Sequence, residues 1–305
     1  MTKYLICRPH GGMNDSLDVV EQCWRYAERY DRRLLVDMKH SAFCKSLADY
    51  FVPLDKSGVD FRYRFKTFSR LDYFTCEPRL AQHRINRYKT RIKLHETISE
   101  LEWRMPVETV SGEEIRFDSS KEYSEKILIQ ESYRIASDAD SFLKRVHLIS
   151  EVADEIYETM QKFCTQPYVG IHIRNTDLQS DYLQLFGRLQ LELEGKRVLV
   201  CSDDQDVKSA ATKAFPKSEV FSTSEIPFLN GRPYQRPHLT TLAAERKLVI
   251  DSLTDLFSLT FASDFHSASI VDRQEKESGY SQLARRLRDD PRIVENLGIS
   301  NPCRS

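Results

Sequence analysis

Long apolar runs are missing from this chain of 305 residues. No stretch approaches the ~18 consecutive apolar residues of a transmembrane helix, and the opening MTKYLICRPHGG is too short in apolar residues to be a signal peptide. Glycine (10) and proline (11) are also few, which excludes collagen-like and linker-rich proteins. We therefore expect a soluble, cytoplasmic protein with no transmembrane segment. A peripheral contact with a membrane stays open.

Cysteine pairs and an excess of charge are missing too. The seven cysteines are scattered and include no Cys-x-x-Cys pair, so reduced thiols in a cytosol fit better than a disulfide framework or a zinc site. Forty-five Lys and Arg stand against 46 Asp and Glu, a net charge of −1. No global field therefore attracts nucleic acid, and we expect no nucleic-acid partner. Any basic site must be local.

The common glycine-rich nucleotide motifs are the third absence. Residues 8–15, RPHGGMND, place Gly11 and Gly12 before an expected helix, where backbone N–H groups can approach a phosphate. The segment has neither GK[ST] nor GxGxxG, so neither ATP hydrolysis nor a nicotinamide cofactor is indicated. Taken alone, the two glycines are also explained by a plain turn.

What the chain does have is an alternation of strands and helices in both halves, which is typical of parallel sheets. The expected strands are 3–8, 33–38, 168–174, 196–202 and 219–222. The expected helices are one with Ser16 as its N-cap, 40–51, 138–164, 181–194, one ending near 215, 240–259 and 281–288.

This pattern predicts an α/β fold of two doubly wound, Rossmann-like domains that face a cleft, at 1–165 and 166–305. The first carries an irregular insert at about 52–135. Within it, residues 62–93 hold ten Lys and Arg among several aromatic side chains. This stretch could bind an acidic or carbohydrate acceptor, and a solvated insert is the alternative. The proline-rich loop 226–238 could cover a donor or be a passive surface loop.

Polar residues gather where expected strands end. Three clusters, 8–15, 172–177 and 202–204, follow such strands. Ligands of open parallel sheets lie beyond the carboxyl ends of the strands. The common placement of the clusters therefore predicts a polar ligand held between the two domains.

His172 and Arg174 alternate with apolar Ile171 and Ile173, so both point to the same face of their strand. Buried there, they need anionic or hydrogen-bonding partners. One interpretation of Arg174 is an ion pair with an acid such as Asp177 or Asp203. The other is a two-pronged clamp on a diphosphate, which suits Arg better than Lys.

Asp203 and Asp204 end a strand and open a helix, so one of them can serve as an N-cap. Adjacent acids at a turn point apart, unlike an alternating Asp-x-Asp. We expect capping and substrate hydrogen bonding here rather than a metal site.

Several segments together resemble the GDP-fucose-dependent fucosyltransferases, namely the α-1,6-, nodulation and protein O-fucosyltransferases. They are VGIHIRNTD (169–177), VLVCSDDQDV (198–207), DSLTDLFSL (251–259) and SGYSQLARRL (278–287), in that order, after the opening strand and glycine turn. Good matching covers about 4–37 and 166–287.

The resemblance implies a GT-B-like fold, a GDP-fucose donor, a carbohydrate acceptor, inversion at carbon, and no metal cofactor. His172 would approach the guanine and Arg174 the β-phosphate, while Asp255, or less directly Asp251, would read the guanine N1 and N2 edge. The implied nucleotide-sugar site consists of Gly11, Gly12, Asn14, His172, Arg174, Asp203, Asp204, Asp255, Ser278 and Ser281, with the two serines near the phosphates.

Two departures from the family pattern matter. Asn175 stands where many members have a second Arg, which leaves the sugar open. The charged run DRQEKE (272–277) precedes SGYS, so Ser267 or Ser269 is an alternative phosphate ligand to Ser278.

The chemistry predicts the roles of the catalytic groups. Charge builds on the β-phosphate as GDP leaves, so Arg174 is the expected stabiliser. A carboxylate should help to deprotonate the acceptor hydroxyl, and Asp177 is the first candidate and Asp15 the second. A transferase for another nucleotide sugar and a non-catalytic nucleotide- or glycan-binding protein remain the alternatives.

Overall fold

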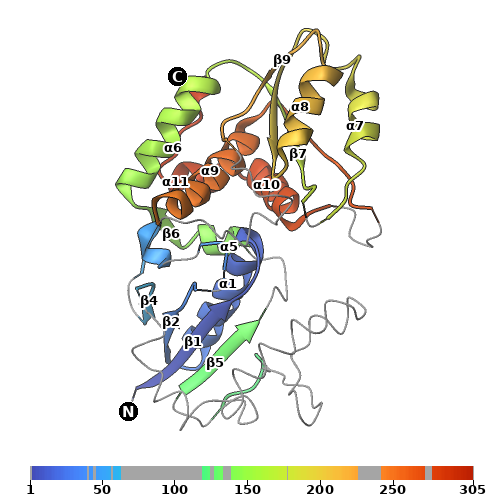
Figure 1. The fold of residues 1–305 in the computed structure, drawn as a ribbon. Helices are drawn as coiled ribbons and strands as arrows, with labels where there is room; N and C mark the ends of the chain where they lie inside the picture. The colour runs from blue at the N-terminus through green and yellow to red at the C-terminus, as the bar shows by residue number, and fades with distance from the viewer. Residues whose placement is uncertain are drawn as a thin grey trace. The chain divides into compact units, whose positions relative to one another are not determined.

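The computed structural model describes residues 2–39, 41–43, 46–55, 58–62, 119–123, 127–132, 139–176, 178–225, 242–271 and 277–304 (Figure 1). The chain divides into two compact units, 1–145 and 146–305. Each unit contains its own four-stranded, wholly parallel sheet, so the fold is mixed α/β.

The first unit is built on strands β1 (Lys3–Pro9), β2 (Arg32–Val36), β4 (Val59–Asp60) and β5 (Ile127–Ser132), in the order β4-β2-β1-β5. Its other elements are α1 (Met13–Arg29), the 3₁₀ turn η1 (Leu47–Asp49), β3 (Phe51–Pro53) and α5 (Ala139–Leu143). The apolar run Leu5-Ile6-Cys7 is fully buried, as expected of a central parallel strand covered on both faces. Trp24 of α1 packs edge-on against Phe61 and Phe142 and joins α1 to the rest of this core.

The second unit is built on β7 (Val169–Ile173), β8 (Arg197–Ser202), β9 (Glu219–Phe221) and β10 (Asp264–Ser267), in the order β10-β7-β8-β9. Its other elements are β6 (Val146–Leu148), α6 (Ser150–Phe163), α7 (Tyr182–Leu189), α8 (Gln205–Ala214), α9 (Leu242–Phe261), α10 (Gly279–Asp289), α11 (Arg292–Asn296) and η5 (Pro302–Arg304). All five residues of β7 are buried.

In both sheets the chain adds strands on one side of the starting strand, β1 or β7, and then places its last strand on the other side. In the second unit the chain adds β8 and β9 on one side of β7, then returns through α9 to place β10 on the other side. The first unit does the same, with β5 on the far side of β1. Such a reversal leaves a crevice at the carboxyl ends of the two central strands.

Gly170 lets α9 lie close to β7. A Cβ at this position would be 2.9 Å from Leu259 Cδ2 and 3.1 Å from the Ala262 Cβ, both on or just after α9. Real Cβ contacts are rarely so short, so a side chain here would disturb the packing of Leu259 and Ala262 against the strand.

The long helix expected at 138–164 is wrong, because the segment forms α5, β6 and α6. Phe142 packs into the core of the first unit, while Ile156 and Met160 are buried in the second, where α6 packs on α9. One straight helix cannot serve two cores. For the same reason the division falls after residue 145, whereas the sequence analysis placed it after 165.

The helix expected at 40–51 is also wrong in its described part. Ser41 pairs with Gly11 in an isolated bridge, and Phe51 begins β3. The Ser41 hydroxyl donates to Met38 O at 2.9 Å and accepts from Phe43 N at 3.2 Å. Local serine bonds of this kind compete with helical ones.

Ser16 is not an N-cap. Helix α1 begins at Met13, with Gly12 as its N-cap in an extended conformation, and Ser16 N already bonds to Gly12 O. Strands β5 and β10 were not predicted from the sequence. Within the described residues, no helix combines the length and apolarity that crossing a membrane would require.

Candidate functional site

The candidate site lies at the carboxyl edge of the second sheet, where the strand order reverses. His172, near the end of β7, pairs in register with Ser267, the last residue of β10. On the other side of β7, Ile173 pairs with Ser202 at the end of β8. Polar residues from three strands therefore meet at one edge, as the sequence predicted for 172–177 and 202–204.

His172 is buried, with 7% of its surface exposed, and is held on two sides. Its Nδ1 lies 2.6 Å from Ser281 Oγ, and its ring stacks on Tyr280 with centroids 4.7 Å apart. Burial, together with the nearby Arg174 cation, lowers the pKa of His172 to about 3. The imidazole is therefore neutral at physiological pH.

Helix α10 begins beside His172. Ser278 is its N-cap, and the Ser278 hydroxyl accepts from Ser281 N at 3.1 Å. The two hydroxyl oxygens are 3.0 Å apart, and both serines are buried. Three residues that the sequence singled out separately, His172, Ser278 and Ser281, thus form one cluster. Tyr280 was not singled out, although its place between the serines was visible.

Arg174 is bound to Asp203, as one interpretation of the sequence expected. Arg174 Nη1 lies 3.0 Å from Asp203 Oδ2, while 20% of the arginine side chain stays exposed. Asp203 also accepts from Asn175 N at 2.8 Å and from Thr176 Oγ1 at 2.6 Å. One carboxylate therefore holds both the arginine and the loop that leaves β7.

Asp204 is the N-cap of α8, one of the two roles expected for the pair. Its Oδ1 accepts from Asp206 N at 2.9 Å, and its Oδ2 accepts from Asn175 Nδ2 at 2.8 Å. Every carboxylate oxygen of Asp203 and Asp204 thus accepts a hydrogen bond from a protein donor.

Asp255 of α9 is buried among polar side chains. It accepts hydrogen bonds from Thr223 Oγ1 at 2.6 Å and from Ser224 Oγ at 2.8 Å. Burial raises the pKa of Asp255. Lys208 of α8 joins the same cluster by donating to Ser224 O at 2.7 Å. Cys201 also hydrogen-bonds this carboxylate, whose two oxygens can together accept up to about four hydrogen bonds.

Thr223, Ser224 and Lys208 were not predicted from the sequence. The signal for Thr223 and Ser224 was the run of three hydroxyl residues, 222–224, directly after β9, whereas Lys208 on α8 had no such signal. The alternative guanine reader, Asp251, is instead bound to Lys247 at 2.8 Å on the same helix.

Ser267, one alternative phosphate ligand, is engaged by charged neighbours. Its hydroxyl donates to Glu277 Oε1, which also accepts from Arg285 Nε at 2.8 Å. The other alternative, Ser269, follows β10, and its backbone N–H bonds Asp181 at 2.7 Å. A phosphate next to Ser267 would meet the Glu277 carboxylate, which the sequence analysis had treated only as part of a charged run.

The first unit carries the remaining predicted residues. Gly11 has φ 100°, which favours glycine, and Gly12 caps α1. Asn14 is 4% exposed, and neither its Nδ2 nor its Oδ1 has a hydrogen-bond partner among the described residues. Asp15 lies in the first turn of the same helix. Asp177, most of the basic stretch 62–93 and the loop 226–238 lie outside the described residues.

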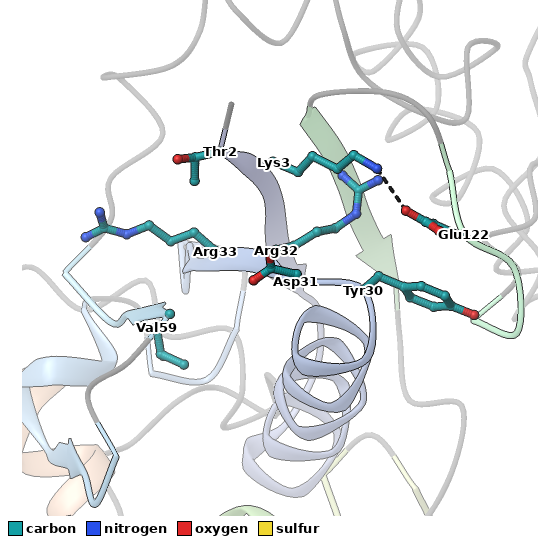
Figure 2. Close-up of a pocket in the computed structure, with 9 residues that line it drawn as sticks. Thr2, Lys3, Tyr30, Asp31, Arg32, Arg33, Val59 and Glu122 are labelled. Atoms are coloured by element: carbon teal, nitrogen blue, oxygen red, sulfur yellow. Dashed lines mark hydrogen bonds and ion pairs between the residues drawn. The ribbon is translucent and has the colours of Figure 1, made fainter.

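Two other polar features lie away from these strand ends. A hollow of about 750 Å³ at the amino ends of β1 and β2 is lined by Lys3, Arg32 and Arg33, and Lys3 bonds Glu122 at 2.8 Å (Figure 2). Within the described residues, three possible metal ligands converge at Glu192, Asp264 and His266; Asp264 lies at the amino end of β10.

Comparisons with known proteins bear on the fold. No family model and no curated protein match the sequence. The solved structure of NodZ α-1,6-fucosyltransferase co-crystallized with GDP matches with a TM-score of 0.56 at 14% identity, covering 93% of this chain and 92% of that one. The chain has the NodZ fold. Fucosyltransferase NodZ from Bradyrhizobium matches likewise, with a TM-score of 0.55, 17% identity and 93% of both chains covered.

The expected resemblance to GDP-fucose-dependent fucosyltransferases is therefore confirmed in the fold. The likeness to NodZ spans nearly the whole chain, beyond the segments that carry recognisable motifs. POFUT1 in complex with GDP-fucose is a more distant match, with a TM-score of 0.45 at 12% identity over 94% of both chains. At such identities the chemistry has to be argued from this chain's own residues.

Proposed function

We propose that this protein is a glycosyltransferase that moves fucose from GDP-fucose to a hydroxyl of a glycan or glycoconjugate, with inversion at carbon. The observation that carries the proposal is the cluster at the carboxyl edge of the second sheet. There a neutral His172, the Arg174–Asp203 pair and the first turn of α10 come together. NodZ, which has the same fold, was crystallised with GDP.

The proposed enzyme is GT-B-like. Its second unit binds the nucleotide sugar, with Ser278 and the first turn of α10 near the phosphates. Its first unit contributes Gly11, Gly12 and Asn14 and serves the acceptor. We include in this proposal the cytoplasmic location that the scattered cysteines predict. The proposal is compatible with a peripheral contact with a membrane.

Arg174 is the proposed stabiliser of the leaving group. Negative charge grows on the β-phosphate as the glycosidic bond breaks, so a cation held there favours the transition state over the ground state. Asp203 orients the guanidinium through its ion pair with Nη1, and 20% of the arginine side chain stays exposed. The cost of ordering the arginine is thereby met before the donor arrives.

The proposed general base is Asp177, with Asp15 as the alternative. A carboxylate that accepts the acceptor's proton while the C–O bond forms completes the displacement. Asp255 is the proposed reader of guanine N1 and N2, because a buried carboxylate can accept a hydrogen bond from each of these two donors.

No metal enters this proposal. A divalent ion on a diphosphate needs oxygen ligands that converge on it. The oxygens of Asp203 and Asp204 are turned to the donors of Asn175, Thr176, Arg174 and Asp206. An arginine can neutralise the phosphate charge instead.

Binding and turnover test the proposal together. We expect GDP to raise the melting temperature far more than UDP, CMP or ADP, because at about 100 times Kd a ligand adds roughly 2.7 kcal/mol of stability. GDP-fucose with a glycan acceptor should then release GDP. Equal stabilisation by GDP and UDP would reject the fucosyl donor.

A second candidate is a transferase for another nucleotide sugar. Asn175 favours it, because its side chain bonds Asp204 where many fucosyltransferases have a second Arg, and the sugar contact would differ. A panel of GDP- and UDP-sugars in the same assay separates the two. Nucleotide binding without turnover of any sugar would indicate the non-catalytic alternative.

A further inference from the structure

Two buried hydroxyls lead from the start of α10 to His172. Ser278 Oγ lies 3.0 Å from Ser281 Oγ, and Ser281 Oγ lies 2.6 Å from His172 Nδ1. Only 2% of Ser281 is exposed. The hydroxyl of Ser281 is therefore committed to its neighbours, and Nε2 is the ring nitrogen left to meet a ligand.

The direction of these hydrogen bonds follows from the local field. Ser281 belongs to the first turn of α10, the positive end of an 11-residue helix, and the Arg174 cation also acts on the ring. A ring N–H pointing at a helix N-terminus is unfavourable, whereas a nitrogen lone pair is favourable there. The Ser281 O–H therefore donates to Nδ1, and the proton of the neutral ring sits on Nε2.

The ring is also held in place. Tyr280 stacks on His172 at 4.7 Å with an interplanar angle of 30°, and its own hydroxyl donates to Ser252 O on α9 at 2.5 Å. The α10 turn thus sets both the plane of the imidazole and its tautomer.

We propose that Ser281 is a positioning residue that keeps His172 protonated at Nε2. The nucleotide-sugar site then requires a hydrogen-bond acceptor on the nucleobase. Guanine offers acceptors at O6 and N7 on one edge, whereas adenine replaces the O6 acceptor with the N6 amino donor. Both purines keep the N7 acceptor, so the fixed N–H favours a 6-oxo purine over a 6-amino purine through its contact with the atom at position 6. This inference rests on the proposed function, in which His172 approaches the guanine.

The tautomer can be tested without any ligand. Long-range ¹H–¹⁵N correlation spectra of the protein labelled in its eight histidines report which ring nitrogen carries the proton. The signals that His172→Gln removes identify His172. We expect the Nε2–H pattern in the wild type and a shift toward Nδ1–H in Ser281→Ala. An Nδ1–H pattern in the wild type would overturn the inference, whatever the enzyme does.

The consequence for selectivity is tested by the affinities of GDP, inosine diphosphate and ADP. Inosine diphosphate keeps O6 but lacks the N2 amino group, so it isolates the predicted contact. We expect the wild type to bind GDP and inosine diphosphate more tightly than ADP, and Ser281→Ala to lose on the order of tenfold of that preference, as for one neutral hydrogen bond. The loss should appear in KM for the donor more than in kcat.

Two further variants make the result decisive. Ser258→Ala removes another buried helical hydroxyl of the same unit, and we expect it to keep the wild-type preference. Ser281→Cys preserves the packing with a weak donor, and it should lose the preference even if Ser281→Ala fails to fold. If the wild-type protein binds no GDP, the proposed function is rejected. The tautomer of His172 is then still tested by the spectra alone. If the wild type prefers GDP and inosine diphosphate over ADP and Ser281→Cys shows the same preference, the positioning role of Ser281 is rejected.

Discussion

Arg174 and Asp203 join two neighbouring strands at their carboxyl ends, with Nη1 and Oδ2 3.0 Å apart. Arg174 follows β7 and Asp203 follows β8. The aspartate also accepts from Asn175 N and Thr176 Oγ1. The pair is thus part of the local structure, and the proposed phosphate contact would use the same guanidinium. The two interpretations of Arg174 therefore predict different losses when the residue is changed.

Arg174→Lys should keep the fold and lose activity. Lysine preserves the charge beside Asp203 but not the planar fork that makes two parallel hydrogen bonds to phosphate. We expect kcat/KM to fall on the order of 10²-fold or more. Both the melting temperature and the turnover of one preparation are measured.

A matched control is Arg197→Lys. Arg197 pairs with Glu219 at 2.9 Å at the amino end of β8 and is 18% exposed, close to the value for Arg174. The substitution Arg197→Lys should lower the melting temperature and leave the specific activity unchanged. A destabilised Arg174→Lys enzyme with full specific activity would show that Arg174 is only an ion-pair partner.

His172 should make stability depend on pH. Its pKa is lowered in the folded chain from 6.5 to about 3, so between these values the unfolded chain binds a proton that the folded chain does not. This contribution to stability is complete above pH 6.5 and is lost as the pH falls toward 3, by at most about 1.4 kcal/mol per pH unit.

Urea unfolding of the wild type and of His172→Gln at pH 7, 6 and 5 measures this contribution. We expect the free energy of unfolding to fall less steeply with acidification in the variant, whatever its stability at pH 7. Parallel curves for the two proteins would show that the pKa of His172 is the same in the folded and the unfolded chain.

Gly170→Ala should destabilise the second unit. The new Cβ would meet Leu259 Cδ2 and Ala262 Cβ at 2.9 and 3.1 Å, so the buried Leu259 side chain must shift and the backbone at Ala262 must yield slightly. We expect a loss of about 1–3 kcal/mol, typical of overpacking. Chemical denaturation measures it.

Gly187→Ala is the counterpart within a helix. Apart from its chain neighbours and the backbone of its own helix, no atom of the described residues lies within 4 Å of a Cβ built at Gly187 of α7, so alanine should stabilise the protein by about 0.5–1 kcal/mol. Equal effects of the two substitutions would mean that the close approach of α9 to β7 is not what requires Gly170.

Turnover should survive a chelator. The proposed clamp uses Arg174, and the oxygens of Asp203 and Asp204 already accept protein hydrogen bonds. We expect the same rate in EDTA as with added Mg²⁺ or Mn²⁺, measured as GDP release. Activity that disappears with EDTA and returns with one of these ions would place a metal on the diphosphate.

The sequence alone determined the central strands and the residues at their ends. β1, β2, β7 and β8 were predicted to within about two residues, because a strand buried on both faces reads as a continuous apolar run. The alternation around His172 and Arg174 is likewise a local property.

Tertiary structure alone decided which of these residues meet. β10 is short and polar at both ends, and only its pairing with β7 makes it a strand. Residues 139–163 have one helical spacing but are divided between two cores. Ser281 reaches His172 across 109 positions of sequence, and Thr223 and Ser224 reach Asp255 across more than thirty. Periodicity reports the faces of one element, whereas contacts between elements depend on the strand order of the whole sheet.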